Sequence, residues 1–268
     1  MINVDIVKYS KSAVTGAEVI TFLLEYPRYI HAELMTHRVF SRNASSSRAI
    51  PIERMLEYAT EQTVIPMWTH NQKGMQGQLV TDIDTLNRAN KILEEGLTDA
   101  VSMVKRLDDL GIHKQNANRY LEPFQHIKTL VTTTDLDNWN VLRFHKDAQP
   151  EIKALAGLMI ATKFMVTPEK LAEDEWHLPF VSEEDKKAYS VEDQLKISAS
   201  CGAQTSYRAL DTSIEKALDL YDRLVGSDVL HASPFEHPCR VLQKGERQKG
   251  NLRGWHQLRT DIEKRSRK

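Results

Sequence analysis

Residues Glu18–Tyr26 have the sequence EVITFLLEY, in which β-branched and aromatic side chains dominate. This composition predicts a β-strand. Upstream, residues 2–6 alternate apolar and polar side chains, which indicates a second, half-buried strand. Downstream, Pro27 suits the first position of a helix that follows the strand directly. The chain therefore begins with paired strands and then changes to helix.

The clearest helix follows in the middle of the chain, over residues Asp82–Leu110. Its apolar residues recur three, four or seven positions apart, and Gly111 stands where a helix C-cap belongs. Further helices are expected from Pro150 and over Ile214–Val225, and a strand is expected over Pro238–Gln243. These elements predict an α+β fold with a mixed or antiparallel sheet and several helices, including a long central helix.

The chain has 268 residues, of which 41% are hydrophobic, and a formal net charge of −1. We expect a single compact domain over residues 1–268, since this length supports a core of its own. A near-neutral chain is not typical of a dedicated nucleic-acid binder. Two cysteines exclude a disulfide scaffold, and no apolar run is long enough to span a bilayer. With no signal peptide in residues 1–10, we expect a cytoplasmic protein.

The 11 glycines never fall into a dinucleotide-binding G-x-G-x-x-G motif or a P-loop. Both motifs need glycine because the backbone approaches phosphate closely. A bound nucleotide would therefore be held by Arg, Ser and His side chains.

The densest polar cluster is residues 36–48, with the sequence THRVFSRNASSSR. Its three arginines and four serines suit recognition of phosphate or carboxylate, although a solvated serine-rich loop over Ser41–Ser47 is the alternative. A second basic segment, Lys244–Lys268, holds nine Lys or Arg residues and three acidic ones. It is either a solvated terminal helix or part of an anion site.

Three other groups have candidate chemistry. Residues 231–237, HASPFEH, lack the spacing of a helical zinc site, so no metal is expected and helix capping by Ser233 is favoured. Arg143 stands just before the helix expected from Pro150: taken alone, an exposed arginine that pairs with Asp147 is favoured, and a side chain that points from a loop into a cleft is the alternative. Cys239 lies in an apolar run, which is typical of a buried, inert thiol.

Together these clusters resemble the flavin-dependent thymidylate synthases. The similar segments are the signature at Thr36, His37, Arg38, Ser41, Asn43, Ser46 and Arg48, the segment His231–His237, Ala203–Tyr207, Asn118–Pro123, and Asn138 with Arg143 and Ala148–Ile152. In the family the segment similar to His231–His237 precedes the signature, so the order here is circularly permuted. Such a rearrangement preserves a fold whose termini lie close together.

The chain departs from the family pattern at Thr36 and Ala44, where the family has Arg and an acidic residue, and Glu33 replaces the usual Gln. Thr132 and Thr134 stand where Asn and Arg are usual. The C-terminal arginines Arg253 and Arg259 are candidates to replace the lost contacts.

The resemblance implies an enzyme that uses FAD, NADPH and methylenetetrahydrofolate to methylate dUMP at C5 without an enzymic nucleophile. It implies a homotetramer with shared active sites, a pyrimidine deoxynucleotide as substrate, and neither a membrane nor a stable nucleic-acid partner. By the same resemblance, residues fall into three roles: catalysis by Arg143; FAD binding by His37, Arg38, Ser233, Glu236 and Asn138; substrate binding by Glu33, Ser46, Ser47, Arg48 and Arg119.

Two alternatives stay open because of the departures. One keeps flavin and folate but hydroxymethylates dUMP or modifies dCMP at C5. The other is a nucleotide-binding homologue that has lost catalysis.

Overall fold

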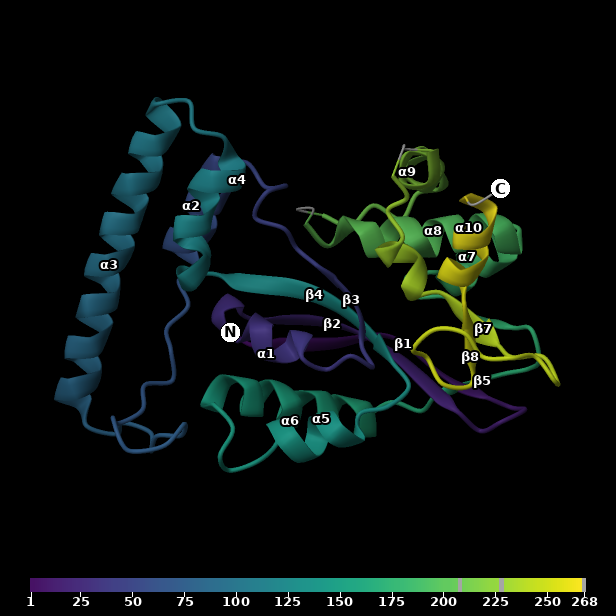
Figure 1. Ribbon diagram of the computed structural model, residues 1–268, viewed down its shortest axis with the longest axis horizontal. Coiled ribbons are helices and arrows are strands. Elements are labelled where there is room, and N and C mark those ends of the chain that lie inside the picture. Colours follow the sequence, from purple (N-terminus) through teal and green to yellow (C-terminus); the bar gives the residue numbers. More distant parts are fainter. Residues whose placement is uncertain (207–208, 227–228, 267–268) are drawn as a thin grey trace.

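The computed structural model describes residues 1–206, 209–226 and 229–266 of the chain. Its main sheet has the strand order β3-β4-β2-β1-β5, shown in Figure 1. The strands are β1 (Asn3–Ser12), β2 (Glu18–Pro27), β3 (Ser41–Ala44), β4 (His126–Thr133) and β5 (Glu169–Leu171). All neighbours are antiparallel except β1 and β5, so the sheet is mixed, as expected.

The strand expected over Glu18–Tyr26 is confirmed as β2, at the centre of this sheet. Its register with β4 places Ile20 opposite Thr133 and Tyr26 opposite Ile127. Ser41–Ser47 was expected to form a loop, but its first four residues are strand β3, which pairs with β4. Polar side chains are compatible with a strand here because β3 is an edge strand with only one paired neighbour.

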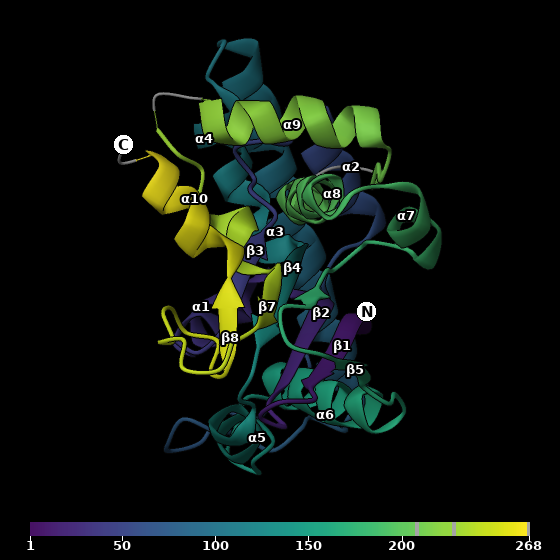
Figure 2. The same ribbon diagram turned by 90° about the vertical axis from the view of Figure 1, so that its right-hand side faces the viewer.

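Helices cover the sheet on both sides (Figures 1 and 2). On one side α5 (Asp137–Arg143) and α6 (Pro150–Phe164) pack against the main core. On the other side lie α7 (Glu183–Ala188), α8 (Val191–Ala203) with η3 (Gln204–Ser206), α9 (Ile214–Gly226), η4 (Ser233–Glu236) and α10 (Leu258–Ser266). A small sheet of β6 (Trp176–His177), β7 (Cys239–Val241) and β8 (Trp255–Gln257) joins this side to the main sheet.

The long helix is confirmed as α3 (Ile83–Asp109), capped by the Asp82 carboxylate, which accepts from the Thr85 N–H. It is central in the sequence but stands at one end of the molecule (Figure 1). There it packs with α2 (Ile52–Glu61), α4 (Lys114–Ala117) and η2 (Asn118–Phe124) around a separate apolar cluster. The short η1 (Arg28–Ile30) and α1 (His31–Met35) link β2 to β3.

Within the described ranges, no helix combines the length and apolar character that a membrane span requires.

Candidate functional site

Arg143 and His37 meet at the end of helix α5. The Arg143 Nε–H donates to His37 Nε2 at 3.0 Å, and its Nη2 donates to the Glu33 carbonyl at 3.2 Å and to Thr36 Oγ1 at 3.0 Å. Arg143 is thus the last residue of a helix, not a loop residue as expected. Nor does it pair with Asp147, whose ion-pair partner is His145.

His37 is held as a neutral imidazole. It is 5% exposed and packs edge-on against Trp139, with a ring-centroid distance of 4.9 Å, and stacks on Phe40. Burial, reinforced by the nearby charges of Arg143 and Arg42, lowers the pKa of His37 to about 4. At neutral pH its Nε2 therefore carries a lone pair, which accepts the guanidinium N–H. Trp139 and Arg143 stand four residues apart on α5, so both face His37.

The same place has hydrogen-bonding capacity that the described chain does not use. The Arg143 Nη1 has no hydrogen-bond partner among the described residues, and Glu33 Oε2 is buried without one. Buried polar atoms are normally paired, so unpaired ones are what a polar ligand would satisfy. Arg38 and Asn138 are both exposed nearby, and Asn138 lies about 140° round α5 from Arg143.

The serines and arginines assigned to the substrate lie beyond the other end of β3. Ser47 is buried and donates to Glu122 Oε1 at 2.6 Å, and Arg119 donates to the same oxygen at 2.9 Å. Ser47 and Arg119 are therefore brought together, through a carboxylate that already binds both. Ser46 and Arg48 line a neighbouring cavity of about 300 Å³.

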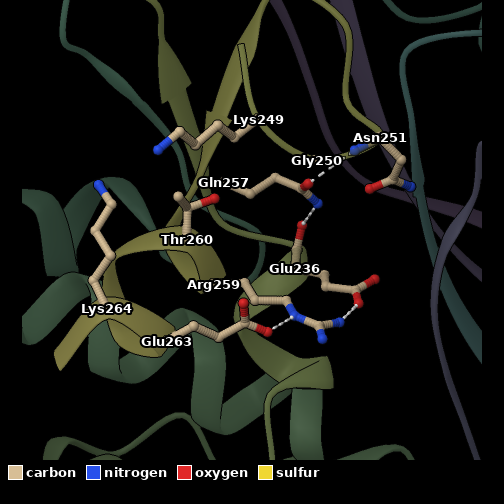
Figure 3. A pocket seen from close by; sticks show the side chains of 9 residues that line it. All are labelled: Glu236, Lys249, Gly250, Asn251, Gln257, Arg259, Thr260, Glu263 and Lys264. Carbon is tan, nitrogen blue, oxygen red and sulfur yellow. Dashed lines mark hydrogen bonds and ion pairs between the residues drawn. The ribbon is translucent and has the colours of Figure 1, made fainter. Parts of the chain in front are cut away.

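Glu236 lines a third location, a cavity of about 400 Å³ between the Lys249–Asn251 loop and α10 (Figure 3). Its carboxylate accepts from Arg259, whose Nε donates to Glu263 at 2.6 Å. Ser233 is exposed and begins a one-turn 3₁₀ helix whose N-cap is Ala232, so the expected cap at Ser233 is wrong. A 3₁₀ helix of a single turn has few free backbone N–H groups for a capping side chain to bind.

His231 and His237 do not converge on one point. His231 is exposed, whereas His237 is fully buried and hydrogen-bonds to Thr132 at 2.9 Å. Among the described residues, no group of three His, Cys, Asp or Glu side chains is arranged to hold a metal ion. Burial raises the pKa of both thiols, to about 12 for Cys201, so neither is a thiolate at neutral pH.

Strand β3 connects these locations. Ser41, at its start, accepts a hydrogen bond from Gln257 at 3.0 Å and lies 3.2 Å from the Asn251 side chain. Asn43 donates to the Gly202 carbonyl at 2.9 Å, which ties β3 to the end of α8. Helix η4 also packs on β3, so the segments similar to the family lie beside its signature despite their order in the chain. Tyr207, which belongs to one of these segments, lies outside the described residues.

Sequence reasoning missed several residues of this region. Trp139 was not singled out, and its buried contact with His37 has no periodic signal because α5 has only seven residues. The cavity residues Gln257, Lys249 and Lys264 were not singled out, although the basic surplus of Lys244–Lys268 pointed to their segment.

Known proteins resemble this chain in sequence and in fold. The family model described as Thymidylate synthase complementing protein matches residues 4–169, more than half of the chain. A crystal structure of a UMP/dUMP methylase, PolB from Streptomyces cacaoi, bound with 5-Br UMP, is 20% identical, with a TM-score of 0.50 over 62% of this chain and 89% of that chain. A second structure of PolB, with 5-Br dUMP, is 17% identical with a TM-score of 0.47, over 62% and 90% of the two chains. None of the curated proteins matches the chain significantly. With its signature residues placed around β3 and more than half of its length matched, the chain belongs to the thymidylate synthase complementing protein family.

Proposed function

We propose that this protein is a flavin-dependent enzyme that methylates dUMP at C5, with methylenetetrahydrofolate as one-carbon donor and NADPH as reductant. The observation that carries the proposal is the Arg143–His37 pair, in a chain of this family. It presents a fixed positive charge with an unused N–H, and Glu33, whose backbone carbonyl accepts from Arg143, also has a buried, unpartnered carboxylate oxygen. The PolB structures, described as those of a UMP/dUMP methylase, support a pyrimidine nucleotide as the substrate class.

In this proposal Arg143 lies beside the pyrimidine and stabilises the negative charge that develops on the ring during C5 substitution. A charge fixed before the reaction stabilises a transition state most, because no reorganisation is needed at that moment. His37 fixes the guanidinium by accepting its Nε–H, and the neutral imidazole adds no second charge. Burial of His37 against Trp139 prevents the pair from rotating away.

FAD would be held by His37, Arg38, Asn138, Ser233 and Glu236. The fit is supported by the cavity beside Glu236, whose volume of about 400 Å³ lies in the range of small-molecule sites. Its lining is mostly polar and charged side chains, with Gly250 in the Lys249–Asn251 loop. When bound, FAD would pass electrons from NADPH to the transferred carbon, so that it ends as a methyl group.

The nucleotide would be held by Glu33, Ser46, Ser47, Arg48 and Arg119. Ser46 to Arg48 and Arg119 lie beyond the opposite end of β3 from Arg143, so we propose that two copies of the chain complete each site within a homotetramer. Helix α6 supports this proposal, because apolar residues lie on its solvent side as well as on its core side: Leu158 is 41% and Phe164 87% exposed. Apolar residues on the solvent side of a helix are typical of a helix that a partner covers.

A second candidate keeps the cofactors but changes the reaction, to hydroxymethylation of dUMP or to C5 chemistry on dCMP. The contact between Arg143 and Thr36 favours this second candidate. The family has Arg at position 36, so the residue that contacts Arg143 differs from the family pattern. A third candidate, a homologue without catalysis, rests on the other departures at Ala44, Thr132 and Thr134.

Release of tritium from C5-labelled dUMP, compared with C5-labelled dCMP, tests the proposal. We expect release from dUMP alone, in the presence of FAD, NADPH and methylenetetrahydrofolate. Release from dCMP alone would establish the dCMP form of the second candidate, and the mass of the product separates methylation from hydroxymethylation of dUMP. No release from either, together with no flavin absorbance in the purified protein, would establish the third.

A further inference from the structure

The cavity beside Glu236 is formed by the part of the chain that the family match does not include. The match ends at residue 169, whereas the residues that line this cavity run from Glu236 to Lys264. The cavity nevertheless adjoins the signature strand, because Asn251 donates to the Val39 carbonyl at 3.1 Å and Gln257 donates to Ser41 at 3.0 Å. Residues specific to the C-terminal segment therefore enclose a space next to the family signature.

This loop has a fixed shape. Gly250 has a φ of +90°, and a Cβ there would lie 2.1 Å from Gln257 Oε1. Only glycine fits, both for its conformation and for the close approach of Gln257. Gln257 in turn donates to the Glu236 carbonyl at 2.9 Å, which anchors the cavity floor on η4.

Positive charge is unevenly distributed in the cavity. Arg259 is neutralised by two carboxylates, since it pairs with both Glu236 and Glu263. Lys249, on the opposite loop, forms no ion pair with any residue that the structure describes.

Lys264 has only a weak partner. It reaches the Asp261 carboxylate at 3.5 Å, and that carboxylate also bonds His256 at 2.8 Å. Figure 3 shows the ammonium groups of Lys249 and Lys264 on the same side of the cavity, and Thr260 also lines it, with its hydroxyl toward Gln257. Two ammonium groups that border one cavity repel one another, and an anion bound between them removes that repulsion.

We propose that Lys249, Lys264 and Thr260 form a phosphate-binding subsite, which takes the phosphate group of a nucleotide ligand. Lysine is a point-charge phosphate ligand, and a threonine hydroxyl supplies a neutral donor beside it. The cavity volume of about 400 Å³ leaves room for more of the ligand than its phosphate. That this ligand is FAD or dUMP rests on the proposed function, whereas the phosphate subsite itself does not.

Binding of inorganic pyrophosphate to the full-length protein, measured by isothermal titration calorimetry at physiological salt, tests the subsite. Wild type is expected to bind, and the double variant Lys249→Glu with Lys264→Glu is expected to bind at least about tenfold more weakly. The matched control is Lys244→Glu with Arg247→Glu, which makes the same charge change at exposed positions of the same segment that do not line the cavity. It is expected to change the dissociation constant by less than about threefold, because exposed charges at a distance are screened.

Equal weakening by both double variants, or no binding to wild type, would overturn the subsite. Because all four side chains are exposed, folding is expected to be unaffected, and circular dichroism checks this. If the glutamate variant is misfolded, Lys249→Gln with Lys264→Gln replaces it, with the same outcomes.

Displacement of bound pyrophosphate identifies the ligand. Displacement by FAD and not by dUMP would assign the subsite to the dinucleotide, and the reverse result would assign it to the substrate. If neither displaces pyrophosphate, the assignment to a nucleotide is overturned. A protein that binds pyrophosphate through these lysines but leaves dUMP unmodified would refute the proposed function and retain the subsite.

Discussion

At the scale of single residues, the His37–Arg143 contact depends on the imidazole staying neutral. A protonated His37 has no lone pair at Nε2 and would repel the guanidinium that now donates to it at 3.0 Å. Burial beside Trp139 and the charges of Arg143 and Arg42 keep the pKa of His37 near 4, well below neutral pH. The apolar contact with Trp139 is therefore a condition for the polar one.

Arg143→Ala is expected to lower kcat for dUMP methylation by about 100–1,000-fold, on the analogy of removing one preorganised donor from an anionic transition state. Arg143→Lys keeps the charge but loses the Nε–H bond to His37. Its kcat is expected to lie between those of the wild type and Arg143→Ala. The measurement is steady-state kinetics together with equilibrium binding of dUMP. Unchanged turnover in Arg143→Ala, with dUMP bound normally, would contradict the role given to this residue.

At the scale of elements, the sequence predicted helices and strands best where the signals for an element lie within that element. β2, α3 and the helix from Pro150 were all predicted, because their apolar patterns and caps lie within the element. β3 was missed because its polar residues form a strand only by pairing with β4, about 90 residues later in the chain. The strand expected over Pro238–Gln243 is real but shorter, Cys239–Val241.

The candidate site follows the same division. His37, Arg143 and Glu236 were identified from sequence motifs, yet their partners were not. Pairing of Glu236 with Arg259, and of Ser47 with Glu122, depends on contacts between distant segments that no local pattern records. Motifs therefore gave the candidate residues, whose roles stay predictions, and the fold was needed to show which of them lie in contact.

Gly250→Ala is expected to detach the C-terminal loop from β3. The substitution adds both positive-φ strain, about 1–2 kcal/mol, and a clash with Gln257. Gly245→Ala is the matched control, because Gly245 has a similar φ of +83° with no atom within 4 Å of an added Cβ. In urea unfolding, Gly250→Ala should lose at least about 1 kcal/mol more than the control, since Gln257 loses buried hydrogen bonds. If both variants lose the same free energy of unfolding, the close contact between Gly250 and Gln257 does not contribute to stability.

A buried chain of hydrogen bonds joins the two sheets. His177 bonds Thr21 at 2.9 Å, Thr21 bonds Thr132 at 2.7 Å, and Thr132 bonds His237 at 2.9 Å. Complete burial lowers the pKa of both histidines, to about 3 for His237. Both are neutral in the folded protein, whereas in the unfolded chain each titrates near 6.5.

Stability should therefore fall with acidification before the carboxylates titrate. Below pH 6.5 the unfolded state binds protons that the folded state cannot, so the free energy of unfolding decreases as pH falls. As the pH falls from about 7.5 to 5.5, each buried histidine is expected to lower the free energy of unfolding by about 1.4 kcal/mol. Urea unfolding at a series of pH values measures this change. His237→Gln should reduce this pH dependence by the contribution of one histidine. His70→Gln, at an exposed position, should leave the pH dependence unchanged. A pH dependence that is the same in both variants would refute the account.

At the scale of the whole molecule, the family region supplies the Arg143 pair and the C-terminal segment supplies the cavity beside Glu236. Neither region contains a complete set of the residues assigned to one active site. The exposed apolar face of α6 lies on the same side of the main sheet as α5, which carries Arg143 (Figure 2). An assembly through this face would bury it and bring further residues toward Arg143.

Leu158→Glu is expected to lower the molar mass of the protein in light scattering, because it places an unpaired charge in the proposed interface. Val14→Glu is the control, since Val14 is 50% exposed in the β1–β2 turn and does not belong to α6. Wild type and the control should behave as tetramers. A monomeric wild type, or an unchanged mass in Leu158→Glu, would refute an interface through α6.

The most direct test of the central claim is the mass of the nucleotide product. The wild-type protein is incubated anaerobically with reduced FAD, methylenetetrahydrofolate and dUMP, and the nucleotide is analysed by mass spectrometry. The account predicts dTMP, formed in wild type and strongly reduced in Arg143→Ala. Recovery of unchanged dUMP, or of its hydroxymethyl derivative, would contradict it.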